Sequence, residues 1–119
     1  MQDMAEQPTP LSITQTTTAG GTRVLVLSGE VDFDTVDLLR GALQMDDSSP
    51  VRFVLDLSAV TFIDSSTISV LAAAHGNASS AGGWIRLAAM SHPVQRVVGL
   101  VGLDTVLACY PTLAQALAP

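Results

Sequence analysis

The pattern of hydrophobic and polar residues predicts that the chain opens with a β-hairpin. Residues 11–17 alternate between apolar and polar side chains and are rich in β-branched types, Gly20-Gly21 supplies a turn, and residues 24–27 form a continuous apolar run ending at Gly29. Because the second run is apolar on both faces, we expect it to lie in the centre of a sheet.

Beyond the hairpin, helical patterns alternate with strand patterns. Apolar residues recur at helical spacing from Val36 to Leu43, with Asp32 or Asp34 available as a cap, and residues 46–50 are predicted to end this helix. The remaining predicted elements are a strand at 51–57, a helix from Ile68 that ends at Gly76, a strand at 84–88 after the turn Gly82-Gly83, a helix from Ser91 to Gly102, a strand at 105–107 and a helix at 111–117.

This order, β-β-α-β-α-β-α-β-α, predicts an α/β fold with a mixed, mostly parallel β-sheet, an N-terminal hairpin and about four helices. The length of 119 residues fits one domain. We place that domain at residues 11–119 and expect residues 1–10, which are polar and contain two prolines, to form a flexible tail. Because function in such sheets lies beyond the C-terminal ends of strands, the predicted loop Ser58–Ser66 is the first candidate site.

Charge and composition narrow the classes of function. Five basic residues, all Arg, face eleven acidic ones, and the net charge of −6 argues against binding to nucleic acid or to an anionic membrane surface. One cysteine (Cys109) and two histidines (His75, His92) fall short of any zinc signature, so we expect no metal and no cofactor. Neither a basic leader nor an apolar run of about 18 residues is present, which predicts a soluble, cytoplasmic protein.

Two segments resemble the sequence signatures of one known family. Residues 54–66, VLDLSAVTFIDSS, and residues 27–32, LSGEVD, are similar to the two motifs of anti-sigma factor antagonists, which are single-domain members of the STAS family. The resemblance extends over residues 11–118 and implies a STAS domain without enzymatic activity. It also implies a regulatory switch. The unphosphorylated antagonist binds an anti-sigma factor that is also a serine kinase, the sigma factor is released, phosphorylation of one serine ends binding, and a serine phosphatase acts as a further partner.

Carried onto this sequence, the resemblance assigns the phosphate to Ser65. The residue pattern supports this position, because a serine at the predicted N-cap of a helix lies beside unpaired N–H groups that could donate hydrogen bonds to a phosphate. Candidate partner-binding residues are Glu30, Asp32, Asp64, Ser65, Ser66 and Thr67. The alternative interpretation is structural: residues 64–66 cap a helix, and Glu30 and Asp32 belong to a solvated turn.

Thr67 stands where the family pattern has Gly, and this departure keeps other functions open. We expect its branched side chain to occupy space beside Ser65 that a docking kinase needs, so that Thr67→Gly would speed phosphorylation. One alternative is therefore a STAS scaffold that binds its partner constitutively, and another is a domain that senses a small ligand such as a nucleotide. An enzyme is the least favoured class, because Ser65 and His75 lie about 15 Å apart along a helix and no other nucleophile–base pair is visible.

Overall fold

The elements of the fold alternate in the predicted order. The computed structural model describes residues 10–44 and 51–118. In these ranges the chain forms β1 (Ser12–Thr17), β2 (Arg23–Val31), α1 (Val36–Ala42), β3 (Arg52–Ile63), α2 (Ser65–Ser80), β4 (Trp84–Ala88), α3 (His92–Val101), a short 3₁₀ helix at Leu103–Thr105, β5 (Ala108–Tyr110) and α4 (Leu113–Leu117). The predicted α/β fold class is confirmed.

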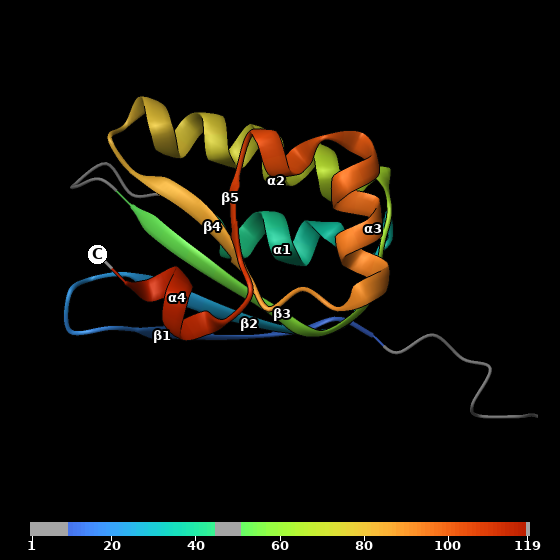
Figure 1. Cartoon of the computed structure of the whole chain (residues 1–119), viewed down its shortest axis with the longest axis horizontal. Coiled ribbons are helices and arrows are strands. Elements are labelled where there is room, and N and C mark those ends of the chain that lie inside the picture. The colour runs from blue at the N-terminus through green and yellow to red at the C-terminus, as the bar shows by residue number, and fades with distance from the viewer. Residues whose placement is uncertain (1–9, 45–50, 119) are drawn as a thin grey trace, which may run out of the picture.

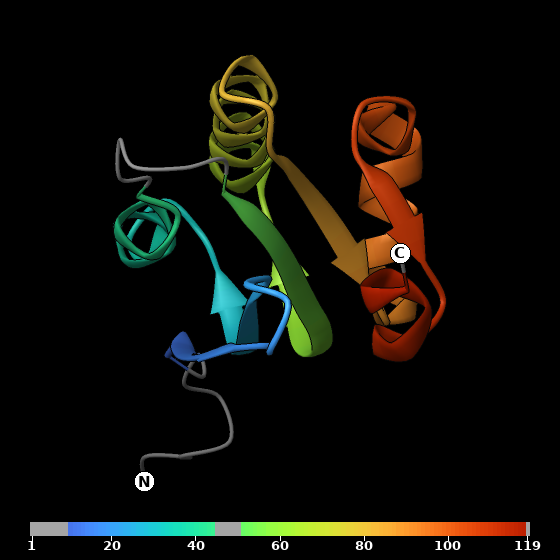
Figure 2. The ribbon, with the colours of Figure 1, turned by 90° about the vertical axis from the view of Figure 1, so that its left-hand side faces the viewer.

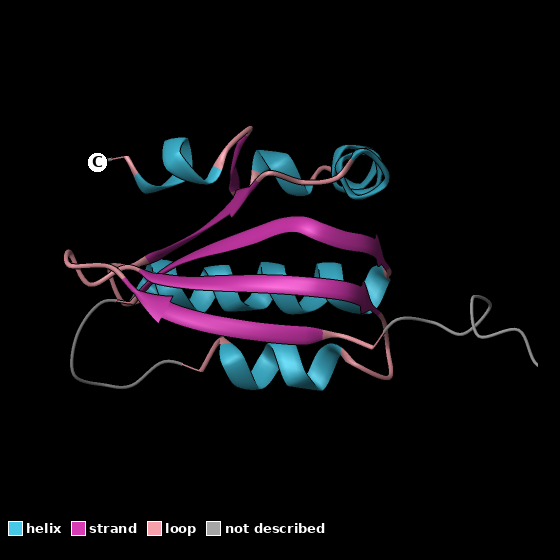
Figure 3. Ribbon diagram, turned by 90° about the horizontal axis from the view of Figure 1, so that it is seen from below, coloured by secondary structure: helices cyan, strands magenta, loops and turns pink. Residues whose placement is uncertain are grey.

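The strands form one mixed sheet in the order β1-β2-β3-β4-β5 (Figures 1 and 3). β1 pairs antiparallel with β2, and every later pair is parallel. The first pair is the predicted hairpin, and β2 and β3 lie in the interior of the sheet. The C-terminal ends of β2 and β3 therefore meet at one edge, where α2 begins.

Two hydrophobic clusters of unequal size hold the layers together. The larger one lies between the sheet and α1, α2 and α3, and its most buried side chains include Leu25, Phe53 and Leu87. The smaller one lies under α4 on the opposite face and contains Val54, Ala88 and Ala116. Figure 2 shows α1 and α2 on one side of the sheet and α4 on the other.

The two central strands run further than the sequence pattern predicts. β2 continues through Gly29 to Val31, and β3 continues to Ile63, so the predicted loop at Ser58–Ser66 is wrong. The physical reason is two shifts in the β2–β3 register, after which Val31 pairs with Ile63. Such bulges add residues to one strand without ending its pairing, and they also disturb the alternation on which the prediction relied.

Two further elements differ from prediction. α2 passes through Gly76 and ends at Ser80, because the exposed glycine is tolerated within the helix. The predicted strand at 105–107 is instead a 3₁₀ turn followed by a strand at Ala108–Tyr110. The predicted tail, apart from Pro10, and the predicted helix break at 46–50 lie outside the described residues.

Candidate partner-binding site

The predicted site residues gather at one edge of the sheet. Glu30 pairs with Phe62 and Val31 pairs with Ile63 at the ends of β2 and β3. Asp32 directly follows β2, and residues 64–67 directly follow β3 and open α2. The parallel pairing thus brings two segments about thirty residues apart in sequence to the same end of the molecule.

Asp64 connects these two segments. Its Oδ1 accepts hydrogen bonds from the backbone N–H groups of Ser66 (3.0 Å) and Thr67 (3.2 Å), and its Oδ2 accepts one from the N–H of Phe33 (3.0 Å). Asp64 is therefore the N-cap of α2, and the predicted N-cap at Ser65 is wrong because Ser65 is the first helical residue. The carboxylate caps the helix and also holds the loop that follows β2.

The same contacts determine the charge of Asp64. Burial opposes ionisation, but the hydrogen bonds from Ser66, Thr67 and Phe33 outweigh it and lower the pKa of Asp64 below its usual value. A negative charge therefore stands beside Ser65 at neutral pH.

The three consecutive hydroxyl groups at the start of α2 have different surroundings. Ser65 is exposed, and its hydroxyl makes no hydrogen bond with any described residue. Ser66 is half-buried and its hydroxyl donates to Oδ1 of Asp64. Thr67 is only 2% exposed, and its Oγ1 donates to the carbonyl oxygen of Val31 at 3.0 Å. Only Ser65 offers its hydroxyl to an incoming protein.

The side chain of Thr67 thus faces the interior. The expectation that it fills surface space needed by a docking kinase is wrong, because the side chain is buried and its hydroxyl is bonded to the end of β2. Thr67 supports the site from within.

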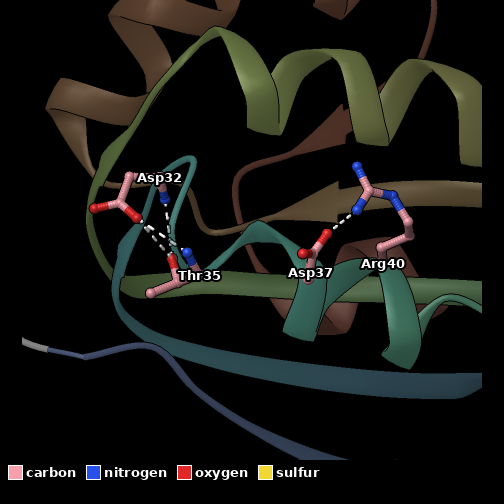
Figure 4. Close-up of polar contacts among 4 residues, drawn as sticks. All are labelled: Asp32, Thr35, Asp37 and Arg40. Carbon is pink, nitrogen blue, oxygen red and sulfur yellow. Dashed lines mark hydrogen bonds and ion pairs between the residues drawn. The ribbon is translucent and has the colours of Figure 1, made fainter.

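The turn between β2 and α1 is built by Asp32 and Thr35 (Figure 4). Oδ1 of Asp32 accepts from the N–H groups of Asp34 (3.0 Å) and Thr35 (3.1 Å), while Oγ1 of Thr35 accepts from the N–H of Asp32 (3.0 Å). The prediction that Asp32 or Asp34 is the N-cap of α1 is wrong, because the helix begins at Val36 and its N-cap is Thr35. Asp32 instead fixes the shape of the turn. Further along α1, Figure 4 shows the exposed ion pair between Asp37 and Arg40.

Two exposed aromatic residues lie in the segments that meet at this edge of the sheet, and sequence reasoning missed both. Phe33 is 79% exposed in the turn that Asp64 holds, and Phe62 is 46% exposed in register with Glu30. The available signal was that Phe33 fits neither the strand alternation before it nor the helical stripe after it. Large exposed aromatic side chains are typical of protein-binding surfaces.

Other kinds of site find less support in the described ranges. No group of three or more His, Cys, Asp or Glu residues there could hold a metal ion. No helix in those ranges is both long enough and apolar enough to cross a membrane.

A groove of about 680 Å³ lies between α1 and α2. Ser66 and Asn77 are among its lining residues, so the groove adjoins the surface around Ser65.

Comparisons with known proteins agree with this geometry. The family model of the STAS domain matches residues 14–116. The chain is 31% identical over 101 residues to an anti-sigma F factor antagonist of Paenibacillus polymyxa, covering 82% of this chain and 85% of that one. It is 34% identical over 113 residues to an anti-sigma-F factor antagonist of Mycobacterium tuberculosis, covering 91% and 89%.

Solved structures give the same result. The crystal structure of an anti-sigma factor antagonist from Mycobacterium paratuberculosis superposes with a TM-score of 0.79 at 33% identity, covering 90% of this chain and 91% of that one. An antagonist solved in its unphosphorylated form shares the fold with a TM-score of 0.71 at 20% identity, covering 88% of this chain and 92% of that one. The sequence match over most of the chain and the shared fold together show that this chain belongs to the STAS domain family.

Proposed function

We propose that this protein is an anti-sigma factor antagonist, that it binds its anti-sigma factor through the surface around Ser65, and that phosphorylation of Ser65 ends the binding. The relatives' names support the class of partner. The observation that carries the assignment to Ser65 is that its hydroxyl alone is exposed and unbonded, whereas those of Ser66 and Thr67 are held by Asp64 and Val31.

The surroundings of Ser65 explain how a phosphate would act. Phosphorylation adds roughly −1.5 to −2 charge at neutral pH. The N–H groups of Ser66 and Thr67 already donate to the Asp64 carboxylate, so they are not free to donate to a phosphate on Ser65, contrary to the expectation from the sequence. The phosphate instead projects into solvent beside a second negative charge, and a partner docked over this surface would have to desolvate both.

The fold itself should tolerate the modification. The Ser65 hydroxyl has no hydrogen bond to lose within the described residues, and a negative group in the first turn of a helix interacts favourably with the macrodipole. Binding and folding should therefore respond separately to a charge at this position, which is what a reversible switch requires.

The neighbouring residues take two roles in this proposal. Phe33 and Phe62 supply apolar contact area, with Glu30 at the rim of the surface. Asp32, Asp64, Ser66 and Thr67 hold the turn and the start of α2 in place through the hydrogen bonds described above. They are positioning residues for the partner-binding surface.

The anti-sigma factor is proposed to act also as the serine kinase that phosphorylates Ser65. A serine phosphatase is proposed to restore the unphosphorylated form that binds, and both reactions are proposed to take place in the cytoplasm.

The antagonist is proposed to be a binding module and not a catalyst. In the described structure, Nδ1 of His75 faces the N–H of Ile85 at 3.4 Å, on the side of α2 that packs toward β4, so it forms no pair with Ser65.

The proposal is tested with the cognate anti-sigma factor and three variants. Ser65→Ala should bind like wild type and accept no phosphate, whereas Ser65→Asp should lose about a thousandfold in affinity, equivalent to about 4 kcal/mol. The melting temperature of Ser65→Asp should change little, because the electrostatic effect at a helix N-terminus is only about 0.3–1 kcal/mol. Ser80→Asp, with the same charge at the other end of α2, is the matched control and should bind normally.

Isothermal titration calorimetry measures these affinities, and mass spectrometry after treatment with kinase locates the phosphate. The assignment to Ser65 fails if the phosphate maps to Ser66 or Thr67. The switch fails if Ser65→Asp binds as tightly as wild type, or if its affinity and its stability fall together.

A further inference from the structure

A second concave surface lies at the end of the sheet opposite to Ser65. It has a volume of about 520 Å³ and forms where the β1–β2 turn, the starts of β3 and β4, and the end of α4 come together. Figure 1 shows these segments at the left end of the molecule, whereas α2 starts at the right. Its lining includes Thr18, Thr22, Arg52, Trp84, Arg86 and Leu117. The volume falls in the usual range of small-molecule sites.

The charge of this pocket is opposite to that of the whole protein. The chain has a net charge of −6 and five arginines, and two of those five, Arg52 and Arg86, line this one pocket. No carboxylate of the described residues lines it or forms an ion pair with either guanidinium group. Among residues 10–44 and 51–118, two arginines without a carboxylate partner are thus brought together at one place on an acidic protein, which favours an anionic ligand.

Both guanidinium groups are held in place. Nη2 of Arg52 donates to the carbonyl oxygen of Gly20 at 2.7 Å, which ties β3 to the hairpin turn. Nη1 of Arg86 donates to the carbonyl oxygens of Ala116 (2.9 Å) and Ala118 (3.1 Å), and its guanidinium lies 3.7 Å from the centre of the Trp84 ring. Each guanidinium has five N–H donors, so these contacts orient the groups and leave donors for a ligand.

We propose that this pocket binds a small organic anion, in which a phosphate or carboxylate group lies between Arg52 and Arg86 and an apolar ring lies beside Trp84 and Leu117. Thr18 and Thr22 line the same pocket. Oγ1 of Thr18 accepts a hydrogen bond from the N–H of Thr22 (3.1 Å), and a hydroxyl held in this way still has its own hydrogen to donate to an oxygen of the anion. The site does not depend on Ser65, so it would operate whether or not the switch does.

Phenyl phosphate is the probe for the full-length chain, because it combines both parts of the proposed ligand. Trp84 is the only tryptophan, so its fluorescence and its indole N–H signal in NMR report directly on this pocket. We expect a saturable change at Trp84, with phenyl phosphate binding about tenfold more tightly than either inorganic phosphate or phenol alone. Benzoate in place of phenyl phosphate tells whether the site prefers a carboxylate.

Two arginine variants separate a specific site from general attraction of anions. Arg52→Gln should weaken phenyl phosphate binding about fivefold, and it is preferred over a change at Arg86, which also holds the end of α4. Arg96→Gln is the matched control, because Arg96 is exposed on α3 and lies outside the pocket. Arg96→Gln and Ser65→Asp should both bind like wild type.

Three results would overturn the proposal. The first is no saturable change at Trp84 with phenyl phosphate up to about 20 mM, well above a dissociation constant of about 1 mM. The second is an equal loss of affinity for phenyl phosphate in Arg52→Gln and Arg96→Gln, which would show that the ligand responds to the net charge of the protein and not to this pocket. The third is inorganic phosphate binding as tightly as phenyl phosphate, which would indicate an adventitious ion only.

Discussion

At the scale of single residues, Thr67 joins the start of α2 to the end of β2. It is the one buried polar side chain among the described residues, and its hydroxyl donates to the Val31 carbonyl across 36 positions of sequence. With Asp64, which holds the turn after β2 through Phe33, it fixes the helix against two parts of the sheet edge. The position of the exposed Ser65 thus depends on the hydrogen bonds that its neighbours Asp64 and Thr67 make with the end of β2 and the turn after it.

This arrangement predicts that Thr67→Val costs about 1 kcal/mol of unfolding free energy, since it removes one buried hydrogen bond and keeps the branched shape. Urea denaturation measures the loss. Thr61→Val makes the same change at an exposed position of β3 and should stay within about 0.5 kcal/mol of wild type. A loss in Thr67→Val no larger than that in Thr61→Val would contradict this view of Thr67.

At the scale of elements, the sequence allowed the order of strands and helices to be predicted, but not where β3 and α2 end. Alternation identifies a strand only while its register is regular. The two bulges in β3 place Leu57, Val60 and Ile63, each three residues from the next, all in the interior. The resemblance pointed to Ser65 as the site of phosphorylation, and that assignment stays a prediction. The resemblance could not show that Asp64 is the cap, or that Phe33 is exposed, because both depend on how the β2–α1 turn meets α2.

Two glycines of similar appearance in the sequence should behave in opposite ways. Gly76 lies in α2 with open space around a potential Cβ atom, so Gly76→Ala should stabilise the protein by about 0.5–1 kcal/mol. At Gly83 a Cβ atom would lie 1.9 Å from the carbonyl oxygen of Val51, so Gly83→Ala should cost about 3 kcal/mol or more. Chemical denaturation of the two variants in parallel provides the test. Equal effects of the two substitutions on the free energy of unfolding would mean that α2 does not run through Gly76, or that Gly83 does not pack tightly against Val51.

At the scale of the whole molecule, the two faces of the sheet are unequally supported. The face covered by α1, α2 and α3 carries the large cluster. The cluster under α4, a helix of five residues, has Val54, Ala88 and Ala116 as its buried members, with partly buried side chains such as Trp84 and Tyr110 packed against them. Elements with few buried apolar contacts open at lower free energy than the core. Because the end of α4 also closes the pocket around Arg52 and Arg86, the proposed anion site lies on the less stable side of the fold.

Native-state hydrogen exchange should therefore resolve two levels of stability. The amide of Ala116 in α4 should exchange through a local opening, whereas the amide of Leu55 in β3 should exchange only on global unfolding. Arg86→Gln removes the hydrogen bonds to Ala116 and Ala118 and should lower the first opening free energy by about 1–3 kcal/mol. If α4 opens independently, Arg86→Gln should change the opening free energy of the Leu55 amide much less. If both amides report one free energy, and Arg86→Gln lowers both equally, then α4 belongs to the same cooperative unit as the core.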